Sequence, residues 1–275
     1  MHLSNCDENY LFKISGNGYI NSMCTFVILR RPEHNWPVLI CANRDELLNR
    51  PWQLPGRHWQ DRLDVVAGRD QVAGGTWLGI NDYGVVAAIL NRRGSLGSKE
   101  GYRSRGELPL EALDHAESAT AAEALANINP ASYRPFNMVV ADSREAFWIR
   151  LAETHWGINL EVKPLPTGLS MITASDRNDK NSSRIRTYLP QFELASEPDP
   201  ESGDWSGWTS LMSSQIYDSD GGVEGAMFIV SESGFGTVCS SLVALPSQKN
   251  QGVRPIFLFA TGRPNQTKFM PVDLS

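Results

Sequence analysis

The sequence predicts an α+β fold in which two packed, mostly antiparallel sheets are flanked by helices. Apolar runs of strand length and longer helical stretches follow one another in the order strands, helices, strands, helices, strands. The strands come in hairpin-like pairs, which is typical of antiparallel pairing rather than of a doubly wound parallel sheet. No Pro/Ser/Gly-rich linker or block of charge divides the chain, so we expect residues 23–275 to form a single domain.

The first strands are expected in two pairs. The apolar runs at 25–29 and 38–42 are separated by a polar turn that contains proline, as in two buried neighbouring strands. After Asn43-Arg44-Asp45-Glu46, a long stretch at 47–75 that contains Pro51, Pro55 and Gly56 has no regular pattern and is expected to be irregular. The second pair is 76–80 and 85–90, and the Asn-Asp-Tyr-Gly turn between them has the residue types that hairpin turns favour.

Helical stretches separate the later groups of strands. Residues 107–128 have a helical composition, and a capping-box pattern from Thr120 to Glu123 predicts that this helix is broken there. A second helix is expected over 181–196, and Pro190 should kink or end it. The remaining expected elements are a short helix at 208–215 and strands at 136–141, 146–151, 156–159, 168–173, 226–231, 237–245 and 255–261.

The composition is that of an ordinary globular protein. The 275 residues carry a net charge of −6 and no basic stripe, which argues against a nucleic-acid partner. No apolar run approaches the ~20 residues that a transmembrane helix needs, so no transmembrane segment is expected. The four cysteines stand at wide spacings that fit neither a disulfide framework nor a metal site. We therefore expect a cytoplasmic location, and the oligomeric state stays open.

Cys24 is the most informative residue, because it follows an internal methionine at the head of an expected strand. If translation starts at Met23, or a cut falls after it, the mature chain begins with a cysteine that carries both a thiol and an α-amine. These groups titrate near ~8.5 and ~7.7–8.0 when unperturbed, so one residue would hold a nucleophile and its base. Residues 1–22 would then be a leader, either a wrongly assigned start or a propeptide.

Several short motifs occur in a fixed order along the chain. They are Met23-Cys24-Thr25, Ala42-Asn43-Arg44-Asp45-Glu46, Gly74-Gly75-Thr76-Trp77-Leu78-Gly79 and Arg105-Gly106-Glu107-Leu108, with Phe136-Asn137 and Phe235-Gly236-Thr237 as weaker members. In these motifs the chain resembles the NRDE family, also called the transport and Golgi organisation 2 family, among the N-terminal nucleophile hydrolases. This resemblance implies a four-layer αββα fold, in agreement with the order of the elements.

The chain is more distantly similar to choloylglycine hydrolases and penicillin V acylases, which begin with Met-Cys-Thr and cleave amides with the exposed cysteine. By this similarity Cys24 is the nucleophile, and Asp45 holds its amine. A Gly-x-Asn-x-x-Gly turn leads to Asn91 as an oxyanion donor, and Arg184 in a Ser-Ser-Arg element favours the thiolate. The residues expected to contact the substrate are Arg44, Trp77, Asn81 and Ser175.

One position departs from the pattern of these amidases. Where they carry a second oxyanion asparagine, this chain has Ser175 and Asp176, and Asn178 is a nearby amide. The favoured interpretation is an N-terminal cysteine hydrolase that cleaves a non-peptide C–N (amide) bond of a small or acyl-bearing molecule. Such chemistry needs no metal or organic cofactor. The missing asparagine keeps an alternative open, namely a non-catalytic haem or lipid carrier, or a trafficking-related binding protein, on the same fold.

Overall fold

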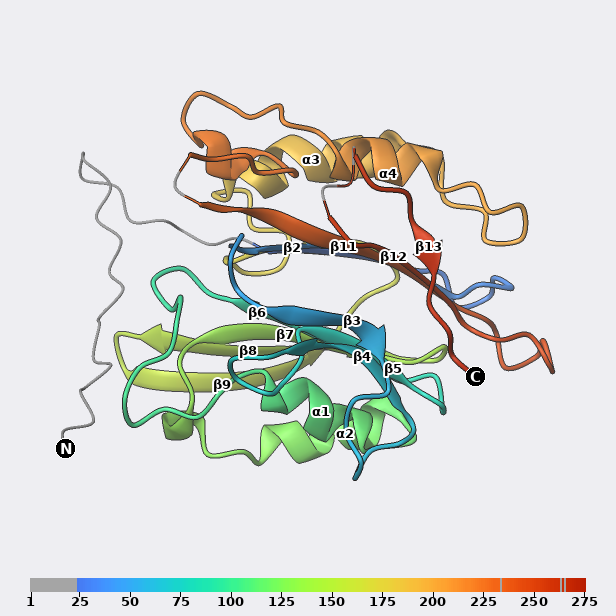
Figure 1. The fold of residues 1–275 in the computed structure, drawn as a ribbon, viewed down its shortest axis with the longest axis horizontal. Helices are drawn as coiled ribbons and strands as arrows, with labels where there is room; N and C mark the ends of the chain where they lie inside the picture. The colour runs from blue at the N-terminus through green and yellow to red at the C-terminus, as the bar shows by residue number, and fades with distance from the viewer. Residues whose placement is uncertain (1–23, 233, 263, 265) are drawn as a thin grey trace, which may run out of the picture.

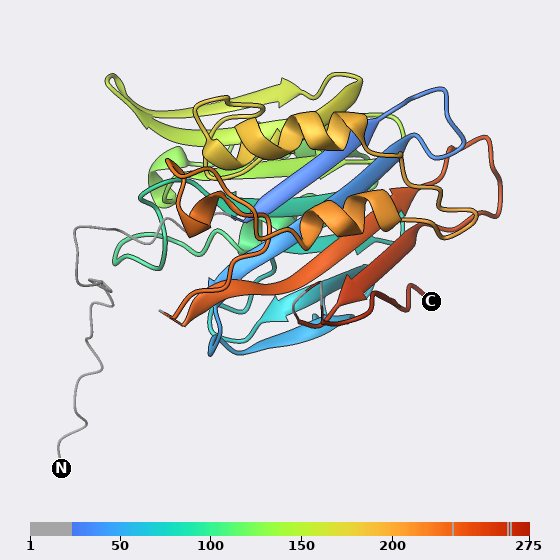
Figure 2. The same ribbon diagram turned by 90° about the horizontal axis from the view of Figure 1, so that it is seen from above.

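Two antiparallel sheets lie face to face, and a pair of helices covers the outer face of each (Figures 1 and 2). The computed structural model describes residues 24–232, 234–262, 264 and 266–275, so the expected leader at 1–22 lies outside the described residues. Over the described part of the chain the layers run helix, sheet, sheet, helix. The predicted α+β class with two packed sheets is confirmed.

The sheet that carries the first described residues has the strand order β10-β1-β2-β11-β12-β13. These strands are β1 Thr25–Arg30, β2 Val38–Leu47, β10 Gly168–Ile172, β11 Phe235–Leu245, β12 Ile256–Ala260 and β13 Met270–Pro271. Strand β1 lies between β10 and β2, with Phe26 opposite both Ile172 and Ala42. Cys24 therefore stands at the end of a strand that is paired on both sides.

The second sheet has the strand order β3-β4-β5-β6-β7-β8-β9, which is the order of the chain itself. Its strands are β3 Trp52–Gly56, β4 Val65–Asp70, β5 Leu78–Asn81, β6 Val86–Asn91, β7 Phe136–Ala141, β8 Ala146–Thr154 and β9 Gly157–Pro164. Every neighbouring pair is antiparallel. This sheet is thus a meander, interrupted after β6 by the first two helices.

Helices close the two outer faces. They are α1 Glu107–Leu113, α2 Ser118–Ala126, α3 Ser183–Leu194 and α4 Ser206–Met212, with short 3₁₀ turns at Pro130–Ser132 and Val223–Gly225. Helices α1 and α2 pack on the second sheet, and α3 and α4 pack on the first. Among the described residues, none of these helices has the length and hydropathy to span a bilayer.

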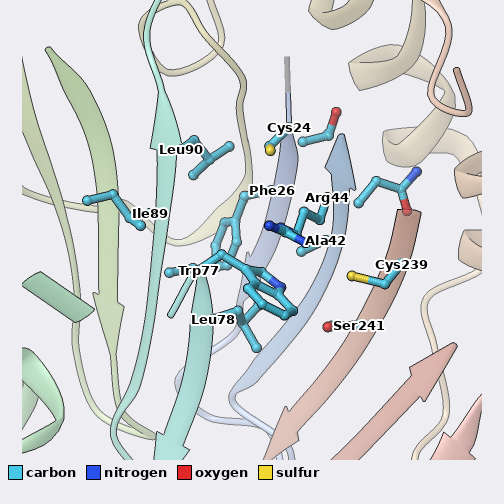
Figure 3. A pocket seen from close by; sticks show the side chains of 13 residues that line it. Cys24, Phe26, Ala42, Arg44, Trp77, Leu78, Ile89, Leu90, Cys239 and Ser241 are labelled. Carbon is cyan, nitrogen blue, oxygen red and sulfur yellow. The ribbon is translucent and has the colours of Figure 1, made fainter. Parts of the chain in front are cut away.

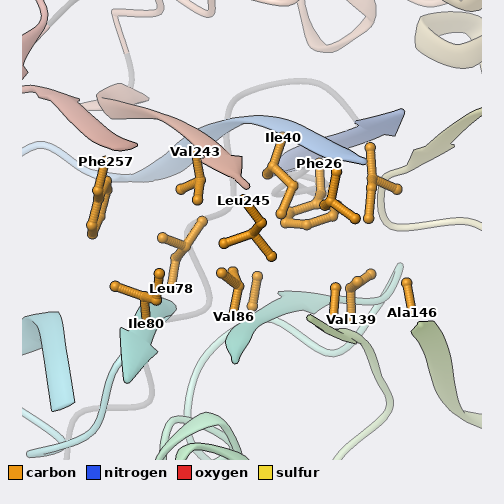
Figure 4. Packing of buried hydrophobic residues seen from close by; sticks show 14 of the residues in the cluster. Phe26, Ile40, Leu78, Ile80, Val86, Val139, Ala146, Val243, Leu245 and Phe257 are labelled. Carbon is orange, nitrogen blue, oxygen red and sulfur yellow. The ribbon is translucent and has the colours of Figure 1, made fainter. Parts of the chain in front are cut away.

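Alternation along the buried strands divides their side chains between two clusters. On β1, Phe26 and Ile28 pack between the sheets, while Val27 and Leu29 pack under α3 and α4. Figure 4 shows the inter-sheet cluster, with side chains of both sheets filling the space between them. Burial of each such side chain contributes about 1.5–3 kcal/mol, which explains why strands covered on both faces are almost entirely apolar.

The stretch expected to be irregular at 47–75 contains two strands, β3 and β4. Strand β2 continues to Leu47, and β3 and β4 form the edge of the second sheet. These strands are short, β3 ends in a Pro-Gly pair, and the β3–β4 pairing shifts register between Gln53 and Gly56. A strand was also expected at 226–231, residues that the structure describes, but none forms there. Within that range only Val230 pairs, in an isolated bridge with Gly236.

The two helical expectations are partly correct. The 107–128 region is broken into α1 and α2, but α2 begins at Ser118, two residues before the predicted cap. Its start is set by tertiary contacts, since both the backbone N–H and the hydroxyl of Ser118 donate to Asp142 at 2.9 Å. Helix α3 runs through Pro190, which lies on the exposed side where water can bind the carbonyl that loses its partner.

Gly75 provides the contact that joins two of the sequence motifs. A Cβ atom at Gly75 would lie 2.4 Å from the backbone carbonyl of Gly106, and the Thr76 N–H donates to that carbonyl at 2.9 Å. We expect Gly75→Ala to lower the free energy of unfolding by about 1–3 kcal/mol through overpacking, measured by urea denaturation. Gly56→Ala is the control, because its Cβ would make only ordinary contacts, with the His58 ring at 3.6 Å and the Leu54 carbonyl oxygen at 3.9 Å; an equal loss there would contradict the argument.

Candidate active site

Cys24 lies at the end of the space between the two sheets, next to the second half of β2 (Figure 3). Its thiol is 3.5 Å from the backbone carbonyl oxygen of Asp45, and the Asp45 N–H donates to the sulfur at 3.4 Å. This contact arises because β1 and β2 pair with Thr25 opposite Asn43, so that Cys24 extends alongside the next residues of β2. The sulfur thus lies beside the backbone of Asp45.

Neighbouring residues of β2 point to opposite faces of the first sheet. Ile40 packs between the sheets and Cys41 packs under α3 and α4, so alternation directs Arg44 inward and Asp45 toward the helices. The contacts agree with this alternation, because the Arg44 guanidinium lies over the ring of Trp77, the residue directly before β5 of the second sheet. Arg44 therefore shares the inter-sheet space with the Cys24 sulfur, while the Asp45 carboxylate lies on the other face.

The Asp45 carboxylate is held by a fully buried polar network. Arg184 Nη1, from α3, donates to Asp45 Oδ2 at 3.0 Å and to the Thr25 hydroxyl at 2.7 Å. The Thr237 hydroxyl donates to Asp45 Oδ1 at 2.6 Å, from a point on β11 where a bulge separates it from Cys239. Burial raises the pKa of the Asp45 carboxyl, and the Arg184 charge and the Thr237 hydrogen bond act against that rise.

From the sequence, Arg184 and Asp45 are expected in one site with the Cys24 thiol. The structure brings Arg184 to Asp45 but not to the thiol. The predicted role for Arg184 was to favour the thiolate, whereas it lies on the helix side of the sheet and bonds Asp45 and Thr25. The Arg44 charge acts to lower the pKa of the Cys24 thiol, against the larger rise that burial causes. The reason is the alternation of β2, which directs Arg44 to the face of the sheet that carries the thiol and Asp45 to the face that meets Arg184.

Arg44 is buried and fixed in orientation. Its Cζ lies 4.2 Å from the centre of the Trp77 ring, an arrangement that suits a planar guanidinium. Its Nη2 lies 3.5 Å from Oε2 of Glu46 and 3.5 Å from Oδ2 of Asp70. Trp77 can lie this close because Gly68 faces it, where a Cβ would be 2.3 Å from the ring.

A small cavity lies between these groups. It has a volume of about 20 Å³ and is lined by Cys24, Arg44 and Trp77 together with apolar side chains, among them Phe26 and Leu90. A space of this size holds about one water molecule. The cavity beside the sulfur therefore has room for about one small polar group. Nowhere in the described residues do three His, Cys, Asp or Glu side chains gather as a metal site would require.

The Cys24 thiol is strongly disfavoured as a thiolate in this arrangement. Burial and then the Asp45 charge raise its pKa to about 12, while the Asp45 N–H and the Arg44 charge act in the opposite direction. In the chain that begins at Met1, we expect iodoacetamide to alkylate Cys24 about tenfold faster per pH unit from pH 7 to 10, without a plateau. Peptide-resolved mass spectrometry measures this rate.

A chain that begins at Cys24 is the comparison for this titration. Its α-ammonium places a positive charge within one residue of the thiol, which lowers the thiol pKa. We expect its alkylation rate to be higher at pH 8 and to level off at a lower pH. Identical profiles for the two chains would show that the free amine does not act on the thiol.

Asn91 and Asn81 are not brought to the sulfur. Asn91 pairs with Phe136 at the end of β6, and Phe136 packs under α1 and α2, so alternation places Asn91 on the outer face of its sheet. The Asn81 amide donates to the carbonyls of Leu113 and His115 at 2.8 and 2.7 Å, which ties the β5–β6 turn to the end of α1. Both positions thus argue against the expected contacts with a bound substrate or its oxyanion.

Ser175 lies in a different hollow of the surface. This hollow, about 330 Å³ in volume, is lined by Ser175, Arg92 and Asp176 among others, and follows β10. The Ser175 carbonyl accepts a hydrogen bond from Asn137 Nδ2 at 2.7 Å. The nearby Asn178 side chain accepts from the Met171 N–H at 2.7 Å, so it is engaged with β10 rather than with the Cys24 cavity.

Arg105 and Thr237 are site residues to which the sequence assigned no role. Arg105 is bound to the Ser95 hydroxyl and the Pro135 carbonyl, and the negative charge of Glu46, with that of Cys24 when it is a thiolate, acts to raise the pKa of Arg105. Burial, followed by the Arg134 charge, nevertheless lowers its pKa to about 10. The signal was present, because both residues belong to motifs of the family resemblance, but no spacing rule connects them to the thiol.

Comparisons with solved structures identify the fold. A Caenorhabditis elegans ortholog of N-acylethanolamine-hydrolyzing acid amidase has a TM-score of 0.56 at 14% identity, over 91% of this chain and 100% of that one. A mutant of the conjugated bile acid hydrolase from Clostridium perfringens has a TM-score of 0.50 at 15% identity, over 91% and 94%. At these identities the likeness is one of fold, that is, two packed antiparallel sheets flanked by helices.

Comparisons of sequence identify the family. The transport and Golgi organization 2 homologs of Mus musculus and Homo sapiens are each 32% identical, over 108 and 113 residues. These matches cover 38% of this chain, and the chain spans 38% of the length of each of these curated relatives. A family model described as Transport and Golgi organisation 2 matches residues 23–251, which is most of the chain. The chain therefore belongs to the Transport and Golgi organisation 2 family.

Proposed function

We propose that this protein is an N-terminal cysteine hydrolase that cleaves the amide C–N bond of a small, acyl-bearing molecule. The observation that carries the proposal is the setting of Cys24, whose sulfur lies beside the Asp45 backbone and faces a buried arginine across a cavity. A nucleophile, a charged group and an enclosed space are the parts that acyl transfer needs. The two fold neighbours, by name an amidase and a hydrolase, support this class of reaction.

The proposed reaction begins with a chain whose first residue is Cys24. Its α-amine takes the thiol proton, and the thiolate attacks the substrate carbonyl carbon, so that a C–S bond forms and the carbonyl π pair moves to oxygen. The tetrahedral intermediate collapses, the C–N bond breaks, and the α-ammonium returns its proton to the leaving amine. Water then hydrolyses the thioester with the same α-amine as the base.

Asp45 and Arg184 act on this reaction from the far face of the sheet. In the proposal the Asp45 carboxylate favours the charged form of the Cys24 amine, since a carboxylate near an ammonium stabilises it. Arg184 is a positioning residue, because it holds Asp45 and Thr25 together at 3.0 and 2.7 Å. Neither side chain lines the cavity beside the sulfur.

The lining of the cavity favours an apolar acyl group on the substrate. Phe26, Leu78 and Leu90 surround the inter-sheet space beside Cys24, and the Trp77 ring forms one wall. Walls of this kind bind hydrocarbon, while Arg44 and Ser241 add polar groups to the lining. We expect the crevice to widen when the acyl chain enters, because about 20 Å³ admits only a single small group.

The test compares two chains, one that begins at Cys24 and one that begins at Met1, with both N-termini verified by intact mass. Each is assayed against N-acyl 7-amino-4-methylcoumarin amides with acyl groups from acetyl to palmitoyl. We expect fluorescence to be released only by the chain that begins at Cys24. Release by neither chain, together with haem or lipid that co-purifies with both, would support the carrier alternative instead.

A further inference from the structure

Arg44 has a buried donor that the fold does not use. Only 6% of the Arg44 side chain is exposed, and its Nη1 makes no hydrogen bond within the part of the chain that the structure describes. Its Nη2, in contrast, lies near Glu46 and Asp70. A buried unsatisfied N–H of a charged group costs more than a neutral one, so such an atom in a native fold calls for an explanation.

The cavity beside Arg44 supplies the explanation. The space lined by Arg44 and Cys24 has room for about one water molecule, which is also the room that one oxygen atom needs. We propose that Arg44 Nη1 is the charged hydrogen-bond donor that binds the substrate carbonyl oxygen as it becomes an oxyanion during attack by Cys24. This inference rests on the proposed function. It assigns the oxyanion donor, a role for which only asparagines were considered from the sequence.

Geometry favours Arg44 over the other candidates. Arg184 lies on the opposite face of the sheet, and Asn91 lies on the outer face of the second sheet. Arg44 is also held as an oxyanion donor should be, because the Trp77 ring and the two carboxylates fix its plane before the substrate arrives. A preorganised donor gains most of its effect where it is shielded from water, and the Arg44 side chain is only 6% exposed.

The reaction step assigns a place to every electron pair. As the C–S bond forms, the carbonyl π pair becomes a lone pair on oxygen, and the Nη1 proton of Arg44 is shared with that oxygen without being transferred. When the intermediate collapses, the lone pair re-forms the carbonyl and the C–N bond breaks. Arg44 keeps its proton throughout, as expected for a guanidinium.

The experiment separates attack on a carbonyl from simple reactivity of the thiol. In the chain that begins at Cys24, we measure acetylation by 4-nitrophenyl acetate and alkylation by chloroacetamide at one pH, both by mass spectrometry at residue 24. Acetylation passes through an oxyanion, whereas alkylation is a direct displacement and does not. Thiolate content and access affect both reactions, so the ratio of the two rates isolates the oxyanion. An acetyl group that moves from sulfur to the α-amine still adds the same mass.

We expect Arg44→Gln to lower the ratio of acetylation to alkylation by about 10²–10³-fold, the usual effect of losing one such donor. Arg50→Gln is the matched control. Arg50 pairs with the same Asp70 and Glu46, at 2.6 and 3.6 Å, but does not line the cavity. Its ratio should stay unchanged. If Arg44→Gln does not fold, Arg44→Lys keeps a cation beside both carboxylates and is expected to lower the ratio about tenfold.

The possible outcomes decide the inference and the proposed function separately. An unchanged ratio in the Arg44 variants overturns the inference, even if the parent chain hydrolyses acyl coumarin amides. A reduced ratio supports it, even if no amide is hydrolysed, in which case the proposed amidase activity alone fails. Equal losses of acetylation and alkylation would show that Arg44 only adjusts the thiol, and would also overturn the inference.

Discussion

Amide hydrolysis is expected to fall by at least about 10⁴-fold when alanine replaces Cys24 at the start of the mature chain. Alanine keeps the free α-amine and a small side chain but removes the nucleophile, so no thioester can form. The fold should survive, because the thiol makes only long contacts with the Asp45 backbone. The measurement is release of coumarin per mole of folded protein, with urea unfolding to verify stability within about 1 kcal/mol.

Cys41→Ala is the control for this prediction. Cys41 is also a buried thiol in the first sheet, but it packs in the cluster under α3 and α4. Its pKa is raised well above the ordinary thiol value by burial, so it is inert at neutral pH. We expect its replacement to leave turnover intact. Hydrolysis that persists in the Cys24→Ala chain would rule out the proposed nucleophile.

The free energy of unfolding is expected to fall by about 3–5 kcal/mol when Asp45 is changed to asparagine. The substitution keeps the shape of the side chain and an acceptor for Thr237, but it removes the carboxylate from beside a guanidinium that is fully buried. A charge in such a place is costly without its counter-charge. Urea unfolding followed by tryptophan fluorescence measures the loss.

The double variant Asp45→Leu with Arg184→Met separates this effect from loss of packing. It removes both charges and replaces them with apolar side chains of similar length, so most of the stability should return. A double variant that is no more stable than Asp45→Asn would contradict the explanation by an isolated buried charge. Thr25 and Glu224, which also bind Arg184, are unchanged in both.

The same Asp45→Asn chain also tests the proposed role of the carboxylate in catalysis. A carboxylate near the Cys24 amine favours the ammonium and raises the pKa of the amine, so its removal lowers that pKa. The amine is then available as a base at lower pH, and the rising limb of the pH–rate profile should move to lower pH. Removal of the Asp45 charge also lowers the pKa of the Cys24 thiol, so a limb that stays in place would show that this charge acts on neither the amine nor the thiol.

Local patterns predicted much of the fold. The strands β1, β6, β7, β11 and β12 were expected within one or two residues, because each is an apolar run bounded by turn residues. Strands β3 and β4 were missed, since the edge strand β3 is short and contains Pro-Gly, and the apolar run of β4 is only three residues long before its glycine. The start of α2 was misplaced because Asp142, distant in sequence, binds Ser118. Contacts of this kind have no local signal.

The sequence by itself determined which cysteine heads a strand, the class of fold and the motifs that identify the family, because these depend on residue order and local periodicity. Only the tertiary structure decided which charged side chains meet the thiol. Arg44 and Asp45 are adjacent in the chain but lie on opposite faces of β2, and pairing with β1 and packing of the second sheet determine which face is inside. Asn91 likewise faces outward because of its pairing with Phe136. A shift of one residue in either register would reverse these assignments, since strand side chains alternate with a period of two.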